Sequence, residues 1–239
     1  MNTDITVIAL LVLAASLAAT ALFNRGRSAL ILLAAGLFTV VAALAFALNA
    51  DWVTSLDDSV ERWLDTHRSQ RWRVDAAGVF SYLGRPLHVA AAGVVAGTLL
   101  SVQARSAIRG ALVIGGVGAG VALEQTFKAV FGRSELTLAA LHDGSLVQYQ
   151  HSYPSGHVTG AATLLGMIAV CIGAGRSRTV KASLAALVVT GVLCVAFLAL
   201  YSRAHIFSDV IGGMFLGATI VTLGAAVLTP VRPRGRLPR

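Results

Sequence analysis

Long apolar runs separated by short polar segments dominate the sequence. Seven such runs cover roughly residues 5–23, 29–49, 87–103, 108–131, 156–174, 182–203 and 207–229. As a helix, each run can cross a hydrocarbon core of about 30 Å, and none shows the alternation of apolar and polar residues that a barrel strand needs. The pattern therefore predicts an all-α fold, a polytopic transmembrane helical bundle.

The composition excludes an ordinary soluble domain. Charged residues make up only 13% of the 239 residues and hydrophobic residues 56%, whereas soluble domains carry about 25% charged residues. Cys171 and Cys194 both lie within apolar runs, so we interpret them as small hydrophobic residues rather than as a disulfide or a metal pair. The first run follows Asp4 and precedes Arg25, the reverse of a signal peptide, so we interpret it as a spanning helix.

The charges are divided unequally between alternate connections of the predicted helices. If the chain starts outside, the inside segments hold 11 of the 19 basic residues and no acidic residue, so their formal charge is +11. The outside segments hold the other basic residues and all 11 acidic ones, a formal charge of −3. This positive-inside signal predicts a multi-pass plasma-membrane protein with a cytoplasmic C-terminus. The basic residues contact anionic lipids, and we expect no nucleic-acid partner.

Residues 51–75, in an outside segment, are more than a simple turn. Apolar residues recur there at helical spacing: Trp52, Leu56, Val60, Trp63 and Leu64. This pattern fits an interfacial amphipathic helix and, equally, a solvated helical linker. The expected organisation is two N-terminal transmembrane helices (1–50), an extracytoplasmic interfacial segment (51–86), a catalytic transmembrane core (87–229) and a basic cytoplasmic tail (230–239).

Ionisable residues gather at the outside ends of four predicted helices, where such residues are costly and usually functional. They and their polar neighbours are Glu124, Lys128, Arg133, Ser155, Gly156, His157, Arg203, His205 and Asp209. The orientation of the chain was derived from loop charges alone. The common sidedness of these residues is therefore independent support for a single extracytoplasmic site.

These residue types predict an oxyanion site. Cations beside a helix N-terminus, with backbone N–H groups at Ser155, Gly156 and His157, favour a negatively charged ligand. His205 and Asp209 are four residues apart and share a helix face, so the carboxylate can fix the tautomer of the ring and leave its other nitrogen as nucleophile or base. His157 can then serve as general acid. The set suits metal-free phosphoryl transfer.

The string from Tyr153 to His157, with Lys128 before it and His205-x3-Asp209 after it, resembles the type 2 phosphatidic acid phosphatase superfamily. These are integral membrane lipid phosphatases that share a helical core with vanadium haloperoxidases. The resemblance extends over residues 51–229. It implies a six-helix phosphatase core, to which the first span adds one extra N-terminal helix.

The resemblance also implies roles for the matching residues. His205 attacks phosphorus and forms a phosphohistidine, Asp209 orients His205, and His157 protonates the leaving oxygen. The phosphate oxygens are held by Lys128, by Ser155 and by the backbone of Gly156. No metal or other cofactor is implied.

Two arginines of the family pattern are displaced in this chain. Counting Lys-x6-Arg from Lys128 reaches Glu135, and the nearest arginine is Arg133, two residues earlier. In the pattern Arg-x5-His the second arginine falls at a position that is alanine here, and Arg203 lies four residues later. We hypothesise that Arg133 and Arg203 replace the family arginines as phosphate ligands. The competing interpretation is a weak or inactive member that binds or transports phospholipid.

Two glutamates are candidate auxiliary residues. Glu124 precedes Lys128 by four residues, the favourable order for an ion pair, so its expected role is a structural salt bridge. Glu135 would repel a phosphate. It therefore points away, pairs with Arg133, or recognises a positive or hydroxyl-bearing part of the substrate.

The sequence thus predicts a phosphatase that hydrolyses a lipid phosphomonoester or pyrophosphate at the outer leaflet. The candidate substrates are phosphatidic acid, phosphatidylglycerol phosphate, and polyprenyl phosphates or diphosphates, and the partners are this substrate and membrane lipids. A transporter would place polar residues at the midplane of several spans. Here they lie at one end of the predicted bundle, which favours an enzyme of the cell envelope.

Overall fold

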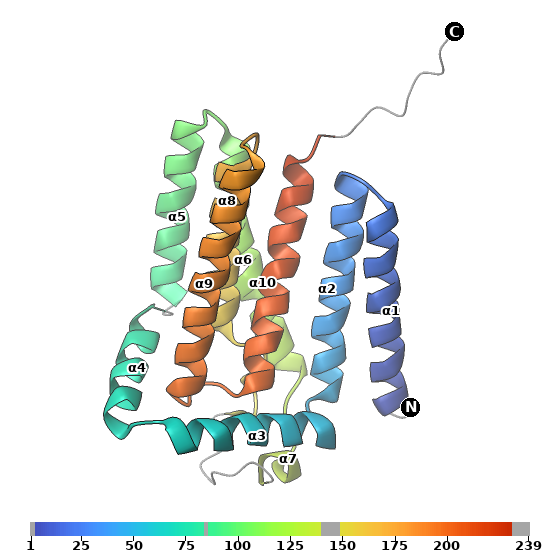
Figure 1. Ribbon diagram of the computed structural model, residues 1–239, viewed down its shortest axis with the longest axis vertical. Coiled ribbons are helices and arrows are strands. Elements are labelled where there is room, and N and C mark those ends of the chain that lie inside the picture. Colours follow the sequence, from blue (N-terminus) through green and yellow to red (C-terminus); the bar gives the residue numbers. More distant parts are fainter. Residues whose placement is uncertain (1–2, 84–85, 140–148, 231–239) are drawn as a thin grey trace.

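A computed structural model describes residues 3–83, 86–139 and 149–230, and every regular element in these residues is helical (Figure 1). The helices are α1 (Thr3–Phe23), α2 (Arg27–Ala47), α3 (Asp51–His67), α4 (Gln70–Leu83), α5 (Pro86–Gln103), α6 (Ala107–Val130), α7 (Glu135–Ala139), α8 (Gly156–Gly173), α9 (Arg178–Tyr201) and α10 (Phe207–Leu228). This confirms the predicted all-α bundle. Most of the predicted basic tail lies outside the described residues.

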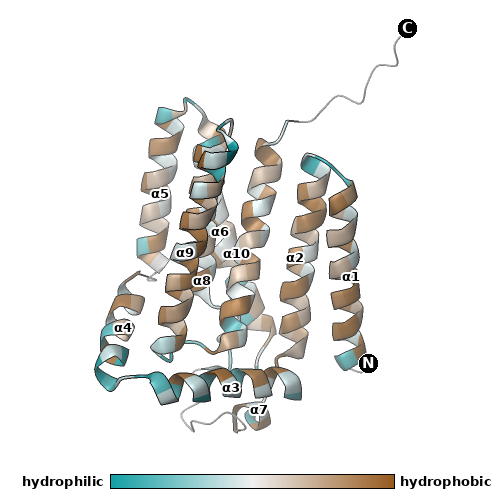
Figure 2. Ribbon diagram, viewed as in Figure 1, coloured by the Kyte–Doolittle hydropathy of each residue, from teal (hydrophilic) through white to brown (hydrophobic). Residues whose placement is uncertain are grey.

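The apolar runs form the long helices of the bundle. Within the described residues, α1, α2, α6, α8, α9 and α10 are each long and apolar enough to cross a membrane. The helices α4 and α5 meet that condition together, as one span bent by 50°. Hydrophobic residues run along the long helices, and hydrophilic residues concentrate at their ends and on α3 (Figure 2). The seven predicted spans therefore correspond to helices whose ends differ from the prediction by a few residues.

The packing of α8 against α10 determines the position of the site. Two glycines of α10 allow these helices to approach closely, because a Cβ at Gly213 would lie 2.7 Å from the carbonyl oxygen of Ser155, and one at Gly217 would overlap Ala162. The first turns of both helices therefore lie side by side. At the edge of the bundle, α1 packs against α2, which in turn packs against α10 (Figure 1).

The helix α3 lies across the end of the bundle where α10 begins, opposite the end where α10 finishes (Figure 1). Its buried residues are Val53, Asp57 and Leu64. Of the apolar residues that recur there at helical spacing, Trp52, Leu56 and Trp63 are exposed. The helix α3 therefore turns Asp57 toward the bundle, where Ser208 of α10 donates hydrogen bonds to it, and leaves these three apolar residues exposed.

Candidate active site

Four helix ends bring the predicted residues together at the end of the bundle that α3 crosses. Lys128 lies in the last turn of α6, His157 in the first turn of α8, Arg203 just after α9, and His205 and Asp209 at the start of α10. The ring centroids of His157 and His205 are 6.3 Å apart. Among the described residues, no group of three or more His, Cys, Asp or Glu side chains is placed to bind a metal ion.

His205 and Asp209 form the predicted pair one helical turn apart. The Nδ1 atom of His205 lies 3.2 Å from Oδ2 of Asp209, and both side chains are buried. A carboxylate facing Nδ1 keeps the proton on that nitrogen and fixes the ring. The Nε2 atom of His205 is therefore the nitrogen left to react.

Arg133 holds the other oxygen of Asp209. Its Nη2 donates to Asp209 Oδ1 at 2.7 Å and to Ser208 Oγ at 2.8 Å, and its Nη1 donates to Tyr149 O and Ser152 Oγ at 3.0 Å. Only 1% of the Arg133 side chain is exposed. Arg133 thus supplies the counter-charge that the buried carboxylate of Asp209 requires, and phosphate binding by Arg133 stays a prediction.

Arg203 turns its side chain toward α3. It has a φ of 59°, the left-handed conformation that often ends a helix, and follows the C-cap Ser202 of α9. Its Nε lies 3.0 Å from Glu61 Oε1, and its Nη2 pairs with Asp65. Arg68 pairs with the same two acids and donates to the carbonyl oxygen of Leu200. Phosphate binding by Arg203 stays a prediction, since carboxylates of α3 are its described ion-pair partners.

The two candidate glutamates differ in their surroundings. Glu124 forms the expected ion pair with Lys128, which confirms the salt bridge predicted from their spacing. The Glu124 carboxylate also lies against the start of α8, because a Cβ at Gly156 would overlap it. Glu135 is exposed at the start of α7, and the guanidinium of Arg133 pairs with an aspartate of α10 instead. Glu124 is thus the acid next to the expected phosphate site.

Ser155 differs in part from the expectation. Its backbone N–H donates to the carbonyl oxygen of Asp209 at 2.9 Å, so this group is not available to a phosphate. Its side-chain Oγ is buried and forms no hydrogen bond with any part of the chain that the structure describes. A buried hydroxyl without a partner is costly, and a ligand oxygen would satisfy it. The first N–H groups of α8, at Gly156 and His157, lack intrahelical acceptors.

Phe80 of α4 packs on both histidines, although the sequence did not single it out. Its ring stacks on His157 with centroids 4.1 Å apart and an interplanar angle of 16°, and meets His205 edge-on at 6.2 Å. Phe80 therefore forms an apolar wall that shields the two imidazoles from water. Its position depends on α4 folding back beside α9, for which the sequence holds no local signal.

Asp57 of α3 is a second residue that the sequence did not single out. Its Oδ1 accepts the N–H of Ser208 and its Oδ2 accepts the hydroxyl of Ser208, both at 2.7 Å. Only 2% of Asp57 is exposed, and burial raises its pKa from 3.8 to about 6, although the charge of Arg133 opposes this. A carboxylate from another helix thus caps the first turn of α10, where N–H groups favour negative charge.

The comparisons with known proteins agree with this arrangement. The PAP2 superfamily model matches residues 109–230, just over half of the chain, and so the chain belongs to the PAP2 superfamily. The matched region contains all the predicted site residues, and it confirms the resemblance found in the motifs. No curated protein sequence matches the chain.

One solved structure shares the fold. It is the crystal structure of the first transmembrane PAP2-type phosphatidylglycerolphosphate phosphatase from Bacillus subtilis. The similarity has a TM-score of 0.63 and 20% sequence identity, and covers 80% of this chain and 93% of that chain. With its apolar helices, the chain is a multi-pass membrane protein, and membership of the superfamily supports a membrane lipid phosphatase.

Proposed function

We propose that the protein is an integral membrane lipid phosphatase that hydrolyses a lipid phosphomonoester or pyrophosphate through a phosphohistidine intermediate. The observation that carries this proposal is the pair of histidines. His205 is fixed by Asp209 through Nδ1, and the second ring, His157, lies 6.3 Å away at the start of α8. One ring can attack while the other protonates the leaving group.

The reaction proceeds in two steps. In the first, Nε2 of His205 attacks phosphorus, the bond between phosphorus and the leaving oxygen breaks, and that oxygen takes a proton from His157. Asp209 stabilises the positive charge that develops on His205. In the second step, water gives a proton to His157 and its oxygen attacks phosphorus. The bond between phosphorus and nitrogen then breaks, which releases phosphate and restores His205.

The phosphate oxygens are held by Lys128, by the hydroxyl of Ser155 and by the N–H of Gly156. The buried, unpaired Oγ of Ser155 supports this assignment. Arg133 acts through Asp209, whose position it fixes, rather than by contact with the phosphate. Because Lys128 pairs with Glu124 in this structure, an arriving phosphate competes with that carboxylate for the ammonium group.

The active site lies on the extracytoplasmic face of the plasma membrane. The connections at the opposite end of the bundle carry basic residues without acidic ones: Arg25, Arg105, Arg109 and Arg176 among them. Such segments are retained in the cytoplasm. The N-terminal end of α10 and the helix α3 are then outside, at the level where the headgroups of the outer leaflet lie.

The test is phosphate release in detergent from phosphatidic acid, phosphatidylglycerol phosphate, and a polyprenyl phosphate and diphosphate. We expect release from at least one of these lipids, and a loss of more than a thousandfold in His205→Ala, because the nucleophile is removed. Acid-labile phosphate trapped on the wild-type chain, and absent from His205→Ala, identifies the intermediate. Release that survives the substitution contradicts the mechanism, and no release from any lipid favours a binding protein.

A further inference from the structure

An apolar groove opens beside His157, between α4, α5, α8 and α9. We name it the inner groove; its volume is about 160 Å³, and its lining includes Phe80, His157, Ala161, Leu165, Val195 and Leu198. Among the described residues that line this groove, His157 is the single ionisable one. The predicted general acid therefore lies at the edge of an apolar groove that can accommodate a hydrocarbon chain.

The inner groove runs away from the site along α8. Ala161 lies one turn beyond His157 and Leu165 lies two turns beyond it. At 1.5 Å per residue, the distance along the helix from His157 to Leu165 is about 12 Å. Because α8 begins at the site and extends into the bundle, this direction leads toward the middle of the membrane. A chain attached to a phosphate at the histidines would enter the groove in the same direction.

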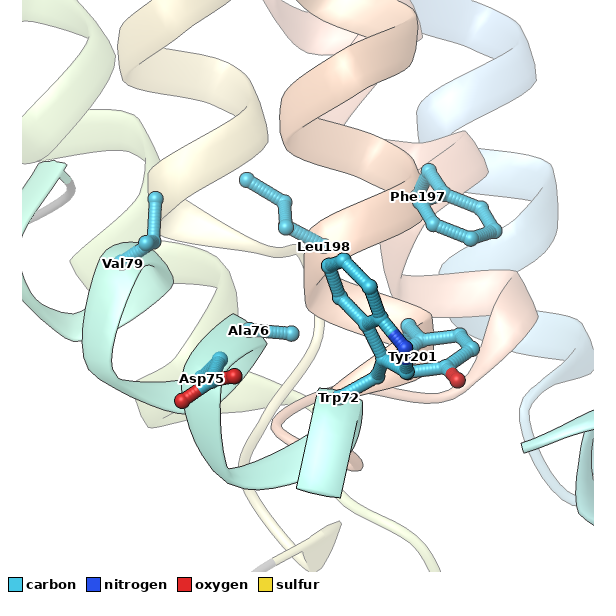
Figure 3. Close-up of a pocket in the computed structure, with 7 residues that line it drawn as sticks. All are labelled: Trp72, Asp75, Ala76, Val79, Phe197, Leu198 and Tyr201. Carbon is cyan, nitrogen blue, oxygen red and sulfur yellow. The ribbon is translucent and has the colours of Figure 1, made fainter. Parts of the chain in front are cut away.

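A second apolar groove adjoins the first at Leu198. This outer groove, between α4 and α9, has a volume of about 510 Å³ and is lined by Trp72, Asp75, Ala76, Val79, Phe197, Leu198 and Tyr201 (Figure 3). In Figure 3 the side chains of Trp72, Phe197 and Tyr201 gather on one side of the groove, and Asp75 points away from Leu198. Trp72 and Phe197 are largely exposed. Such aromatic residues are typical of the membrane–water interface.

We propose that the inner groove binds the hydrocarbon chain of the lipid substrate, and that the outer groove connects it to the surrounding bilayer. This inference rests on the proposed function. The general acid must contact the oxygen that leaves with the lipid, so the lipid part of the substrate has to lie on the His157 side of the phosphate. The inner groove is an apolar space that adjoins His157, and the phosphate lies on the side of His205.

Filling the inner groove tests this proposal. The quantity measured is the ratio of kcat/KM for a long-chain lipid phosphate to kcat/KM for p-nitrophenyl phosphate. In Val195→Trp we expect this ratio to fall about tenfold, because the bulky side chain excludes roughly two methylene groups of the lipid from the groove. The matched control is Leu193→Trp, since Leu193 is an exposed residue of α9 outside both grooves, and it should leave this ratio unchanged. A parallel loss with both substrates, or an unchanged ratio in Val195→Trp, overturns the proposal.

A binding measurement separates this proposal from the proposed function. A lipid phosphate with a diazirine in its chain is photolysed with the full-length His205→Ala protein in detergent, which needs no turnover. We expect labelled peptides at Leu165 and Val195, and loss of that labelling in the same protein carrying Val195→Trp. Labelling spread evenly over exposed α1 would show annular lipid only and would contradict the groove. Absence of phosphate release by the wild type defeats the proposed function instead.

Discussion

At the scale of single residues, Asp209 divides its two carboxylate oxygens between two partners. Oδ2 faces His205, and Oδ1 accepts a hydrogen bond from Arg133. A carboxylate with no exposed surface is stable only if opposite charge and hydrogen bonds compensate its lost hydration. Arg133 supplies that charge, so it holds in place the carboxylate that faces His205.

Arg133→Ala should therefore destabilise the protein as well as inactivate it. Removing one partner of a buried ion pair leaves an uncompensated charge and costs about 3–5 kcal/mol. We expect a lower thermal unfolding midpoint in detergent together with a large loss of kcat. Arg133→Lys should recover only part of the unfolding midpoint and part of kcat, since an ammonium group cannot reproduce the forked contacts of the guanidinium.

Phosphate inhibition distinguishes this role from a direct phosphate contact. If Arg133 bound the substrate phosphate, Arg133→Ala would mainly weaken inhibition by inorganic phosphate and leave the unfolding midpoint near that of the wild type. That result would overturn the positioning role and restore the interpretation made from the sequence. Asp51→Asn, at the exposed start of α3, serves as the control for a charge change in the same region.

At the scale of secondary structure, α3 acts as a brace across the first turn of α10. Asp57 caps that turn through Ser208, and the acids of α3 pair with Arg68 and Arg203 near the end of α9. Ser208 also accepts a hydrogen bond from Arg133. The brace is therefore connected through hydrogen bonds to the carboxylate that faces His205.

The buried carboxyl of Asp57 predicts a pH dependence of stability. Its pKa is about 6 in the folded chain against 3.8 ordinarily, so the folded state binds this proton more tightly than the unfolded state. The contribution to stability is complete below about pH 4 and is lost as the pH rises through 6. The difference between these two pKa values corresponds to roughly 3 kcal/mol of stability.

Asp57→Asn removes this titration and keeps a side chain of similar shape. We expect the unfolding midpoint of the wild type to fall, relative to that of Asp57→Asn, between pH 4 and pH 7. The difference between the two curves isolates Asp57 from Arg133 and Asp209, the charged groups near it. Curves that stay parallel over this interval would show that Asp57 does not titrate there.

At the scale of the whole molecule, the chain places its chemistry at one end of the bundle and its basic connections at the other. The site residues lie at the end of the bundle that α3 crosses. The α5–α6 connection, which carries Arg105, lies at the opposite end. The positive-inside rule therefore predicts that α3 lies outside. We therefore expect a lipid phosphatase in this orientation to act on the outer leaflet.

Labelling with a membrane-impermeant thiol reagent tests this orientation. In a chain carrying Cys194→Ala, since Cys194 is the exposed cysteine, we expect Asp58→Cys on α3 to react in intact cells. Arg105→Cys should react only after the membrane is permeabilised. The reverse pattern of labelling would place the site on the cytoplasmic face.

The sequence by itself determined the features that depend on neighbours along one helix. Apolar runs determined the spans, and four-residue spacings determined the pairs His205–Asp209 and Glu124–Lys128, which the structure contains. Both follow from the fixed geometry of a helix, in which residues four apart share a face. The sequence also predicts the sidedness of the site, because each span reverses the direction of the chain and the basic connections then fall on one side.

Only the tertiary structure decided the contacts between distant segments. Arg133 pairs with Asp209 across 76 positions, Asp57 reaches Ser208 across 151, and Phe80 stacks on His157. In the sequence, Asp57 resembles any solvated acid on a charged helix, and Arg133 resembles a phosphate ligand. Which face α3 buries and where α4 folds back depend on the packing of whole helices. Such packing leaves no periodic pattern in the chain, and so it became visible only in three dimensions.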